Sequence, residues 1–259
     1  MARRSPFNLI LVTEDGDGLR TLRFGHDGVR QSVVKLGDPQ HLELDYINVL
    51  TNCLAFVRNL SRILIVGLGG GTLPGFFRSQ FADIEIDVVE IDPDVLDVAR
   101  TYCGFREDER MHVHVEDGRD FIEGCSNRYD VIILDGFDAE KIPRHLLTLE
   151  FLQAVRNALA PEGVAVANVW GRASNRIYDH MLLTYRDAFD EIYIFDVPDP
   201  GSKIFVALQG KQAMSRQDMI KRAADVSRER GSARDFSGSI AGFRNSDEET
   251  IRGGEVLRD

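Results

Sequence analysis

The fold is decided by residues 63–77, which read ILIVGLGGGTLPGFF. The apolar run Ile63–Val66 predicts a buried strand, and the residues after Pro74 predict a helix. A glycine loop at this junction lets a ligand approach the backbone closely. Its spacing is G-x-G-x-G, and Thr72 stands where a dinucleotide-binding fingerprint has its last glycine. The Gly-Lys-Ser/Thr of a P-loop does not follow either. A nucleoside therefore fits the loop better than NAD or ATP, and a tight turn without a ligand is the alternative.

Apolar runs alternate with helical segments from this stretch to Leu208. After 63–66, the predicted strands are 84–89, 111–115, 131–134, 164–169, 192–195 and 204–208. Nearly continuous apolar strands that alternate with helices indicate a sheet covered on both faces. The pattern thus predicts an α/β fold with a doubly wound, mostly parallel, seven-stranded sheet.

The two ends of the chain differ from this centre. Over residues 1–41, short apolar runs separated by acid–glycine turns predict a small antiparallel β-hairpin sheet. Helical spacing predicts an amphipathic helix over roughly 42–60, which opens a nucleoside-binding α/β domain at 42–210. Residues 211–259 are expected to form a helix and a flexible tail. From Gly231 this tail has few apolar residues, so we expect it to be loosely held.

Composition narrows the classes of function. The 259 residues are 43% hydrophobic and 28% charged, which fits one large soluble domain. A net charge of −11 disfavours nucleic acid as a partner. The sequence offers neither a membrane span nor a secretion signal, and its three cysteines and six histidines lack metal-ligand spacing. We therefore expect a reduced, cytoplasmic protein without a metal, and the N-terminal sheet is a candidate homodimer surface.

Three acids follow three successive strands of the predicted sheet. Glu90 ends the strand after the glycine loop, Asp117 follows the next, and Asp135 ends the fourth. Since the carboxyl ends of parallel strands share one edge, these acids are expected on one rim together with the glycine loop. Each acid taken singly fits a helix cap or a solvated turn equally well. Asp92, followed by proline, is best explained as such a cap.

Four segments in this order carry a resemblance to a known family. They are ILIVGLGGGTLPGFF at 63–77, DVVEIDPDVLDVAR at 87–100, VEDGRDF at 115–121 and YDVIILDGFD at 129–138. Together they resemble the class I S-adenosylmethionine-dependent transferases, whose fold is the methyltransferase-like Rossmann fold. They resemble more closely the spermidine synthase, or polyamine aminopropyltransferase, family. The resemblance covers about residues 19–208.

The resemblance implies a set of residues that bind a nucleoside donor. The expected donor site comprises Gln31, Gly67, Gly69, Gly71, Glu90, Asp117 and Gly118. Glu90 would hold the ribose, where a carboxylate accepts hydrogen bonds from both hydroxyls. Asp117 would lie near the adenine amino group, and Gln31 would reach the amino-acid side of the donor.

The same resemblance implies an acceptor site. Asp135 matches the family's catalytic aspartate, Asp138 its amine-binding aspartate, and Tyr46 a tyrosine of the amine site. Asn168 and Trp170, at the end of the fifth strand, are placed to line the pocket. Trp170 fits an aromatic at the edge of the core equally well.

The chemistry of an amine acceptor suits these residue types. An alkyl amine with a pKa near 10 must lose a proton before it attacks a sulfonium donor, and Asp135 is placed to accept it. Asp138 would pair with a second ammonium. The first hypothesis is therefore transfer of an aminopropyl group from decarboxylated S-adenosylmethionine to a polyamine such as putrescine.

Two alternatives remain open at this point. One is an S-adenosylmethionine-dependent methyltransferase of a small molecule, and the other is a non-catalytic nucleoside-binding relative. Family members usually carry an aspartate in the glycine loop, facing the charged chain of the donor, and this chain has none. The choice between decarboxylated and intact S-adenosylmethionine is thus left open.

Overall fold

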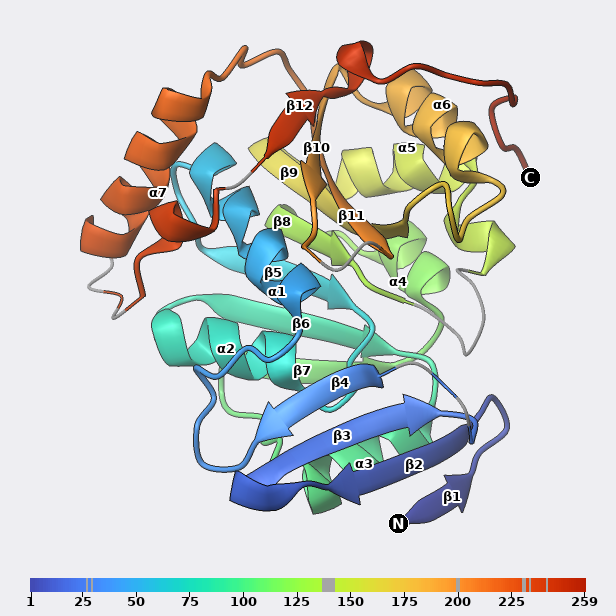
Figure 1. The fold of residues 1–259 in the computed structure, drawn as a ribbon, viewed down its shortest axis with the longest axis vertical. Coiled ribbons are helices and arrows are strands. Elements are labelled where there is room, and N and C mark those ends of the chain that lie inside the picture. The colour runs from blue at the N-terminus through green and yellow to red at the C-terminus, as the bar shows by residue number, and fades with distance from the viewer. Residues whose placement is uncertain are drawn as a thin grey trace.

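The computed structural model describes residues 1–26, 28, 30–136, 143–198, 201–229, 232, 234–240 and 242–259. These residues form two sheets flanked by helices (Figure 1). A four-stranded sheet has the order β1-β2-β3-β4, and an eight-stranded sheet has the order β12-β10-β11-β9-β8-β5-β6-β7. The predicted α/β class, with a mostly parallel main sheet and a small N-terminal sheet, is confirmed.

The N-terminal sheet is antiparallel throughout. Its strands are β1 (Ala2–Arg4), β2 (Leu9–Glu14), β3 (Leu19–Phe24) and β4 (Arg30–Lys35). The last three correspond to the predicted runs, and β1 is an additional edge strand. Ile10 and Leu22 are fully buried in a core that this sheet shares with the main sheet. This packing brings β4 against the helix that follows the glycine loop.

The main sheet contains the predicted strands in the expected arrangement. Its strands are β5 (Arg62–Val66), β6 (Glu85–Glu90), β7 (Met111–Val115), β8 (Tyr129–Leu134), β9 (Leu159–Trp170), β10 (Glu191–Asp196), β11 (Ser202–Leu208) and β12 (Phe243–Asn245). The five strands from β5 to β9 pair in parallel. The other three, β10 to β12, pair antiparallel. All five parallel strands therefore present their carboxyl ends at the same edge.

Helices cover both faces of this sheet. One face packs against α1 (Asp45–Leu50), α2 (Thr72–Gln80), α3 (Pro93–Tyr102) and α7 (Arg216–Glu229), and the other against α4 (Gly118–Gly124), α5 (Leu149–Ala158) and α6 (Tyr178–Ala188). Successive side chains of a strand point to opposite faces, so Ile63 and Ile65 enter the first core, whereas Leu64 and Val66 enter the second. No helix in the described part of the chain is long and apolar enough to cross a bilayer.

The helix predicted over 42–60 is wrong in length and type. The structure has the short α1 followed by a 3-10 helix, η2 (Thr51–Phe56). The Thr51 hydroxyl donates a hydrogen bond to the carbonyl of Asn48 at 2.7 Å. Such a local bond competes with the regular backbone pattern of an α-helix, and threonine and asparagine are weak helix formers. The apolar residues do lie on helical turns, but those after Leu50 belong to the tighter 3-10 helix η2.

The C-terminal segment packs onto the domain, in contrast to the loosely held tail that its composition predicts. Strand β12 pairs with β10 and gives the main sheet an eighth strand where the sequence predicted seven. Phe236 is fully buried and contacts the rings of Phe76 and Phe81. Further on, the carbonyl of Leu257 accepts a hydrogen bond from the amide of Leu149 at 2.8 Å. A few well-buried apolar residues thus anchor a segment whose average composition is polar.

Candidate active site

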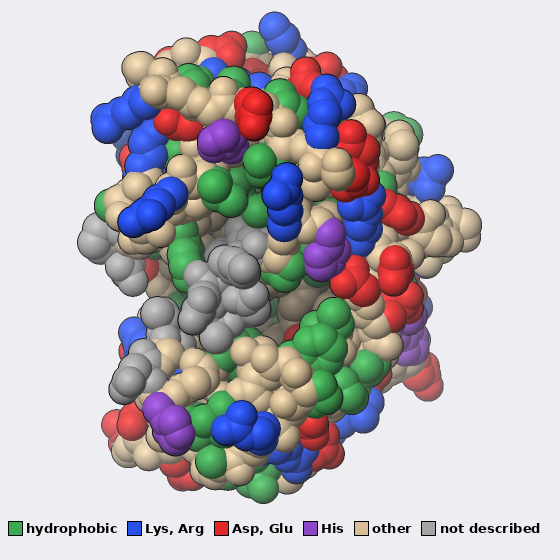
Figure 2. Space-filling view, turned by 90° about the vertical axis from the view of Figure 1, so that its right-hand side faces the viewer, with side chains coloured by type: hydrophobic (Ala, Val, Ile, Leu, Met, Phe, Trp, Pro, Cys, Tyr) green, Lys and Arg blue, Asp and Glu red, His purple; other side chains and the backbone are tan. Residues whose placement is uncertain are grey.

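A cavity of about 530 Å³ opens at the carboxyl ends of the parallel strands. It lies between this edge, the N-terminal sheet and the start of α1, and Figure 2 shows the face of the molecule that is hollowed there. All but one of the predicted site residues that the structure describes line the cavity: Gln31, Tyr46, Gly67, Gly69, Glu90, Asp117, Gly118, Asp135, Asn168 and Trp170. The exception is Gly71. Asp138 lies outside the described residues.

The glycine loop is shaped by close contacts of the backbone. Gly67 has a φ of +103°, and a Cβ there would lie 2.5 Å from the carbonyl oxygen of Asp135. Gly71 has a φ of +83°, and a Cβ there would lie 2.5 Å from the Phe105 ring. Only glycine fits either position. Gly67 therefore borders the cavity, whereas Gly71 is required for close packing against Phe105, just after α3, and is not among the residues that line the cavity.

Thr72 links the glycine loop to the N-terminal sheet. Its hydroxyl donates to the carbonyl of Val33 at 3.0 Å and lies 2.8 Å from the hydroxyl of Ser32. Thr72 is 8% exposed, so both contacts are shielded from water. Thr72, which stands where a dinucleotide fingerprint has a glycine, thus has a structural role. It fixes β4, and with it Gln31, beside the cavity.

Glu90 is held by backbone amides on both of its oxygens. The amide of Leu68 donates to Oε2 at 3.0 Å, and the amide of Asp92 donates to Oε1 at 2.9 Å. Burial raises the pKa of this carboxyl, and the two amide contacts oppose the rise. Each oxygen keeps a lone pair, so the carboxylate can still accept hydrogen bonds from a diol. Asp92 accepts from the amide of Asp94 at 2.9 Å, which confirms it as the cap of α3.

Asp117 combines a structural contact with a place in the cavity wall. One oxygen caps α4 by accepting from the amide of Arg119 at 2.8 Å. The other lies 2.9 Å from Nε2 of His145, which also lines the cavity. His145 was not predicted from the sequence. It follows Asp117 by 28 residues, and no motif spacing connects the two.

Asp135 is the centre of a side-chain cluster drawn from three elements. The hydroxyl of Tyr46, on α1, donates to Oδ2 at 3.0 Å, and the amide of Asn168, on β9, donates to Oδ1 at 3.0 Å. Burial raises the pKa of Asp135 to about 6, although both contacts lower it. A base that titrates close to neutrality is suited to accept a proton during turnover. Tyr46, Asn168 and Asp135, predicted from distant parts of the sequence, are thus brought together.

The cavity is acidic. Among the lining residues that the structure describes, the carboxylates are Glu43, Asp45, Glu90, Asp92, Asp117 and Asp135, and the basic side chains are Arg30 and His145. Arg30 is itself 3.8 Å from a carboxylate oxygen of Glu43. Arg30, Glu43 and Asp45 were not predicted, because a charged residue in a cavity wall and one on a solvated surface look alike in a single sequence. The balance of charge favours a cationic ligand.

The described residues contain no group of three or more His, Cys, Asp or Glu arranged to hold a metal ion. The contacts on the rim instead suit an organic ligand. Carboxylates and backbone atoms lie at one end, around the glycine loop and Glu90, and the Asp135 cluster lies at the other. The arrangement offers hydrogen-bond acceptors and negative charge to hydroxyl and ammonium groups.

Comparisons with known proteins find relatives over most of this chain. A polyamine aminopropyltransferase of Vibrio vulnificus is 34% identical over 83% of this chain and 75% of its own length. The mouse eEF1A lysine and N-terminal methyltransferase is 31% identical over 74% of this chain, but over 30% of its own length. A probable spermidine synthase from Corynebacterium glutamicum shares the fold with a TM-score of 0.81, covering 100% of this chain and 96% of that chain at 22% identity.

The family model of the spermine/spermidine synthase domain matches residues 45–219. This range contains the glycine loop, the three rim acids and the Asp135 cluster. The match covers most of the chain, and it agrees with the relatives found by sequence. The chain belongs to the spermine/spermidine synthase family.

Proposed function

We propose that the protein is a polyamine aminopropyltransferase that uses decarboxylated S-adenosylmethionine as donor and an amine such as putrescine as acceptor. The observation that carries this proposal is the Asp135 cluster inside an acidic cavity. Both reactants are cations, and the carboxylates of the wall stabilise them. Intact S-adenosylmethionine adds a carboxylate, for which Arg30 is available only in competition with Glu43.

The reaction requires one proton acceptor. The amine nitrogen attacks the methylene carbon by which the aminopropyl group is bonded to sulfur. This carbon–sulfur bond breaks, and its electron pair stays on sulfur to give neutral methylthioadenosine. The nitrogen gains a carbon, and the proton that it must lose before the attack goes to Asp135. Burial raises the pKa of Asp135 to about 6. The difference between this pKa and that of an alkyl ammonium is therefore smaller, and the proton transfer is easier. Most of the remaining acceleration would come from holding the two reactants at attack distance.

The other site residues take supporting roles in this proposal. Tyr46 and Asn168 orient the carboxylate of Asp135, and Trp170 lines the acceptor end. Glu90 and Asp117 bind the ribose and the adenine of the donor. Asp138 is kept as the expected partner of the second ammonium.

A small-molecule methyltransferase is the second candidate. Methyl transfer as such is supported by the 31% identity to the eEF1A lysine and N-terminal methyltransferase and by a glycine loop without an acid. The test is an assay with putrescine and each donor in turn, with products identified by mass spectrometry. We expect aminopropyl transfer from the decarboxylated donor. Methylation from intact S-adenosylmethionine, with no aminopropyl product, would replace the first proposal by the second.

A further inference from the structure

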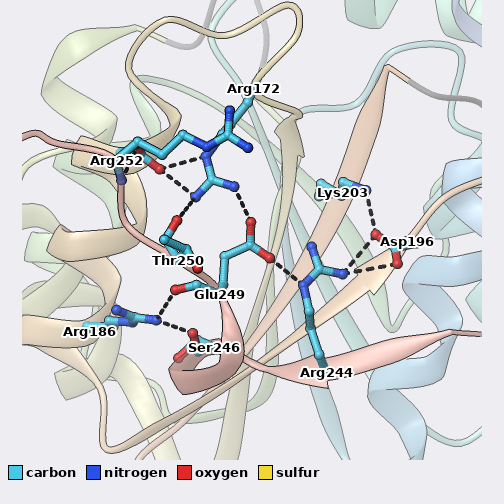
Figure 3. Close-up of polar contacts among 10 residues, drawn as sticks. Arg172, Arg186, Asp196, Lys203, Arg244, Ser246, Glu249, Thr250 and Arg252 are labelled. Carbon is cyan, nitrogen blue, oxygen red and sulfur yellow. Dashed lines mark hydrogen bonds and ion pairs between the residues drawn. The ribbon is translucent and has the colours of Figure 1, made fainter.

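The C-terminal segment 242–252 is joined to the rim of the cavity by a network of ion pairs (Figure 3). Its central residue is Glu249, whose side chain is 11% exposed. One oxygen of Glu249 contacts Arg172, and the other contacts Arg244 on β12. Arg172 follows Trp170 by two residues and also binds Asp179 on α6 at 2.8 Å. The network therefore reaches the point where the chain leaves β9 beside the cavity.

The second part of the network connects the strands β10 and β11. Arg244 donates through Nη1 to both oxygens of Asp196 at 3.0 Å, and Lys203 pairs with the same carboxylate. Asp196 is the last residue of β10, and Lys203 is the second of β11. Their neighbours Val197 and Ser202 line the cavity. The network thus holds the strands on both sides of this part of the wall.

The backbone of the segment is fastened as well. Arg186, on α6, donates to the carbonyls of Ser246 and Glu249, and Arg172 donates to the carbonyl of Thr250 at 2.6 Å. Although burial opposes it, contact with Arg244 and Arg172 lowers the pKa of Glu249. The carboxylate is therefore charged at neutral pH, and its contacts are of the stronger, charge-assisted kind.

We propose that Glu249 is a positioning residue for the acceptor end of the cavity. By holding two arginines at once, it fixes the ends of β9, β10 and β11, and with them Trp170 and Val197, relative to one another. The assignment of this end to the acceptor rests on the proposed function. If one carboxylate is removed from such a network, its partners keep their charge without their counter-ion, so they rearrange. The wall that they support then loses its fixed shape.

The kinetic test compares Glu249→Gln with Glu248→Gln. Glu248 is the exposed neighbour of Glu249, so the control makes the same chemical change and the same change in net charge. For Glu249→Gln we expect the KM for putrescine to rise about ten-fold, while kcat changes by less than about two-fold. The control keeps both values. A parallel loss of kcat, donor affinity and thermal stability would show a purely structural role and overturn the proposal.

Trp170 provides a test that needs no turnover. It is the sole tryptophan of the chain, and it lines the cavity. We expect Glu249→Gln to make its fluorescence more accessible to quenching by acrylamide, and Glu248→Gln to leave it unchanged. If the wild-type protein transfers no aminopropyl group, this quenching difference still supports the positioning role, and the proposed function alone fails. Unchanged quenching in Glu249→Gln overturns the positioning role whatever the reaction is.

A second variant changes the other end of the network. If Glu249→Gln does not fold, Asp196→Asn breaks the network from the β10 side, where the carboxylate is about half exposed. It is expected to give the same increase in quenching and the same rise in the KM for putrescine. Wild-type values in Asp196→Asn would contradict the proposal.

Discussion

The two ends of the cavity are built from different kinds of contact. At the proposed donor end, the carboxylate of Glu90 and one oxygen of Asp117 are held by backbone amides. At the proposed acceptor end, the carboxylate of Asp135 is held by the side chains of Tyr46 and Asn168. Among single substitutions only proline removes a backbone N–H, whereas a hydroxyl or a carboxamide is lost in most substitutions of its side chain. We therefore expect the contacts that hold Glu90 to tolerate substitution of its neighbours, and those that hold Asp135 to depend on the side chains of Tyr46 and Asn168.

The largest expected effect is at the acceptor end. Asp135→Asn removes the proton acceptor, so the maximal rate of transfer should fall by about a hundred- to ten-thousand-fold. Affinity for methylthioadenosine, measured by calorimetry, should stay close to that of the wild type, because the contacts of the donor end are untouched. An equal loss of nucleoside affinity would show that the two ends are not separate.

The same variant decides whether the chain is a non-catalytic relative. In that case the wild-type protein binds the nucleoside but transfers no group to any amine. Asp135→Asn would then change neither property.

The next effect is at the donor end. Glu90→Gln keeps the size of the side chain but loses its charge and one of its two acceptor oxygens, so nucleoside binding should weaken by about 1.5 to 3 kcal/mol. At saturating donor, the rate should be close to that of the wild type. Calorimetry with methylthioadenosine measures the loss, and Glu85→Gln, at the far end of the same strand, is the matched control. Unchanged affinity would rule out Glu90 as the ribose ligand.

The smallest expected effect is a shift in pH dependence. With the pKa of Asp135 near 6, kcat/KM of the wild type should fall as the pH drops below about 6, because the base becomes protonated. Tyr46→Phe removes a hydrogen bond that favours the charged form, so the pKa of Asp135 rises further. The acid limb should therefore move to higher pH by about one unit. An acid limb at the same pH in Tyr46→Phe and in the wild type would show that Asp135 is not the group that titrates.

The strands and the rim acids were predictable because their signals are local and repeated. A parallel strand buried on both faces is apolar at nearly every position, and the edge at which Glu90, Asp117 and Asp135 meet follows from the topology alone. The resemblance to a known family then separated these acids from ordinary helix caps. Asp117 shows how narrow this distinction is, because it caps α4 and lines the cavity at once.

The missed features depend on contacts between distant residues. Gly71 looks like part of a ligand loop, but its conformation is required by the ring of Phe105, 34 residues later. The C-terminal segment has a polar composition, and its attachment depends on Phe236 and on the ion pairs around Glu249. Composition averages over a segment, whereas attachment depends on a few residues that match a site elsewhere. Only the folded chain displays those matches.

The close approach of Gly67 to Asp135 has a consequence for inhibitors. The Asp135 amide donates to the carbonyl of Val66 at 3.0 Å, so part of the wall between the two ends is formed by two paired strand ends, where Gly67 adds no side chain. The gap that a linker must span is then set by the main chain. A compound that joins a nucleoside to an amine gains affinity when its linker matches that span, and it loses this gain when the linker is too short or too long. A series with stepwise linker lengths should therefore show one sharp optimum.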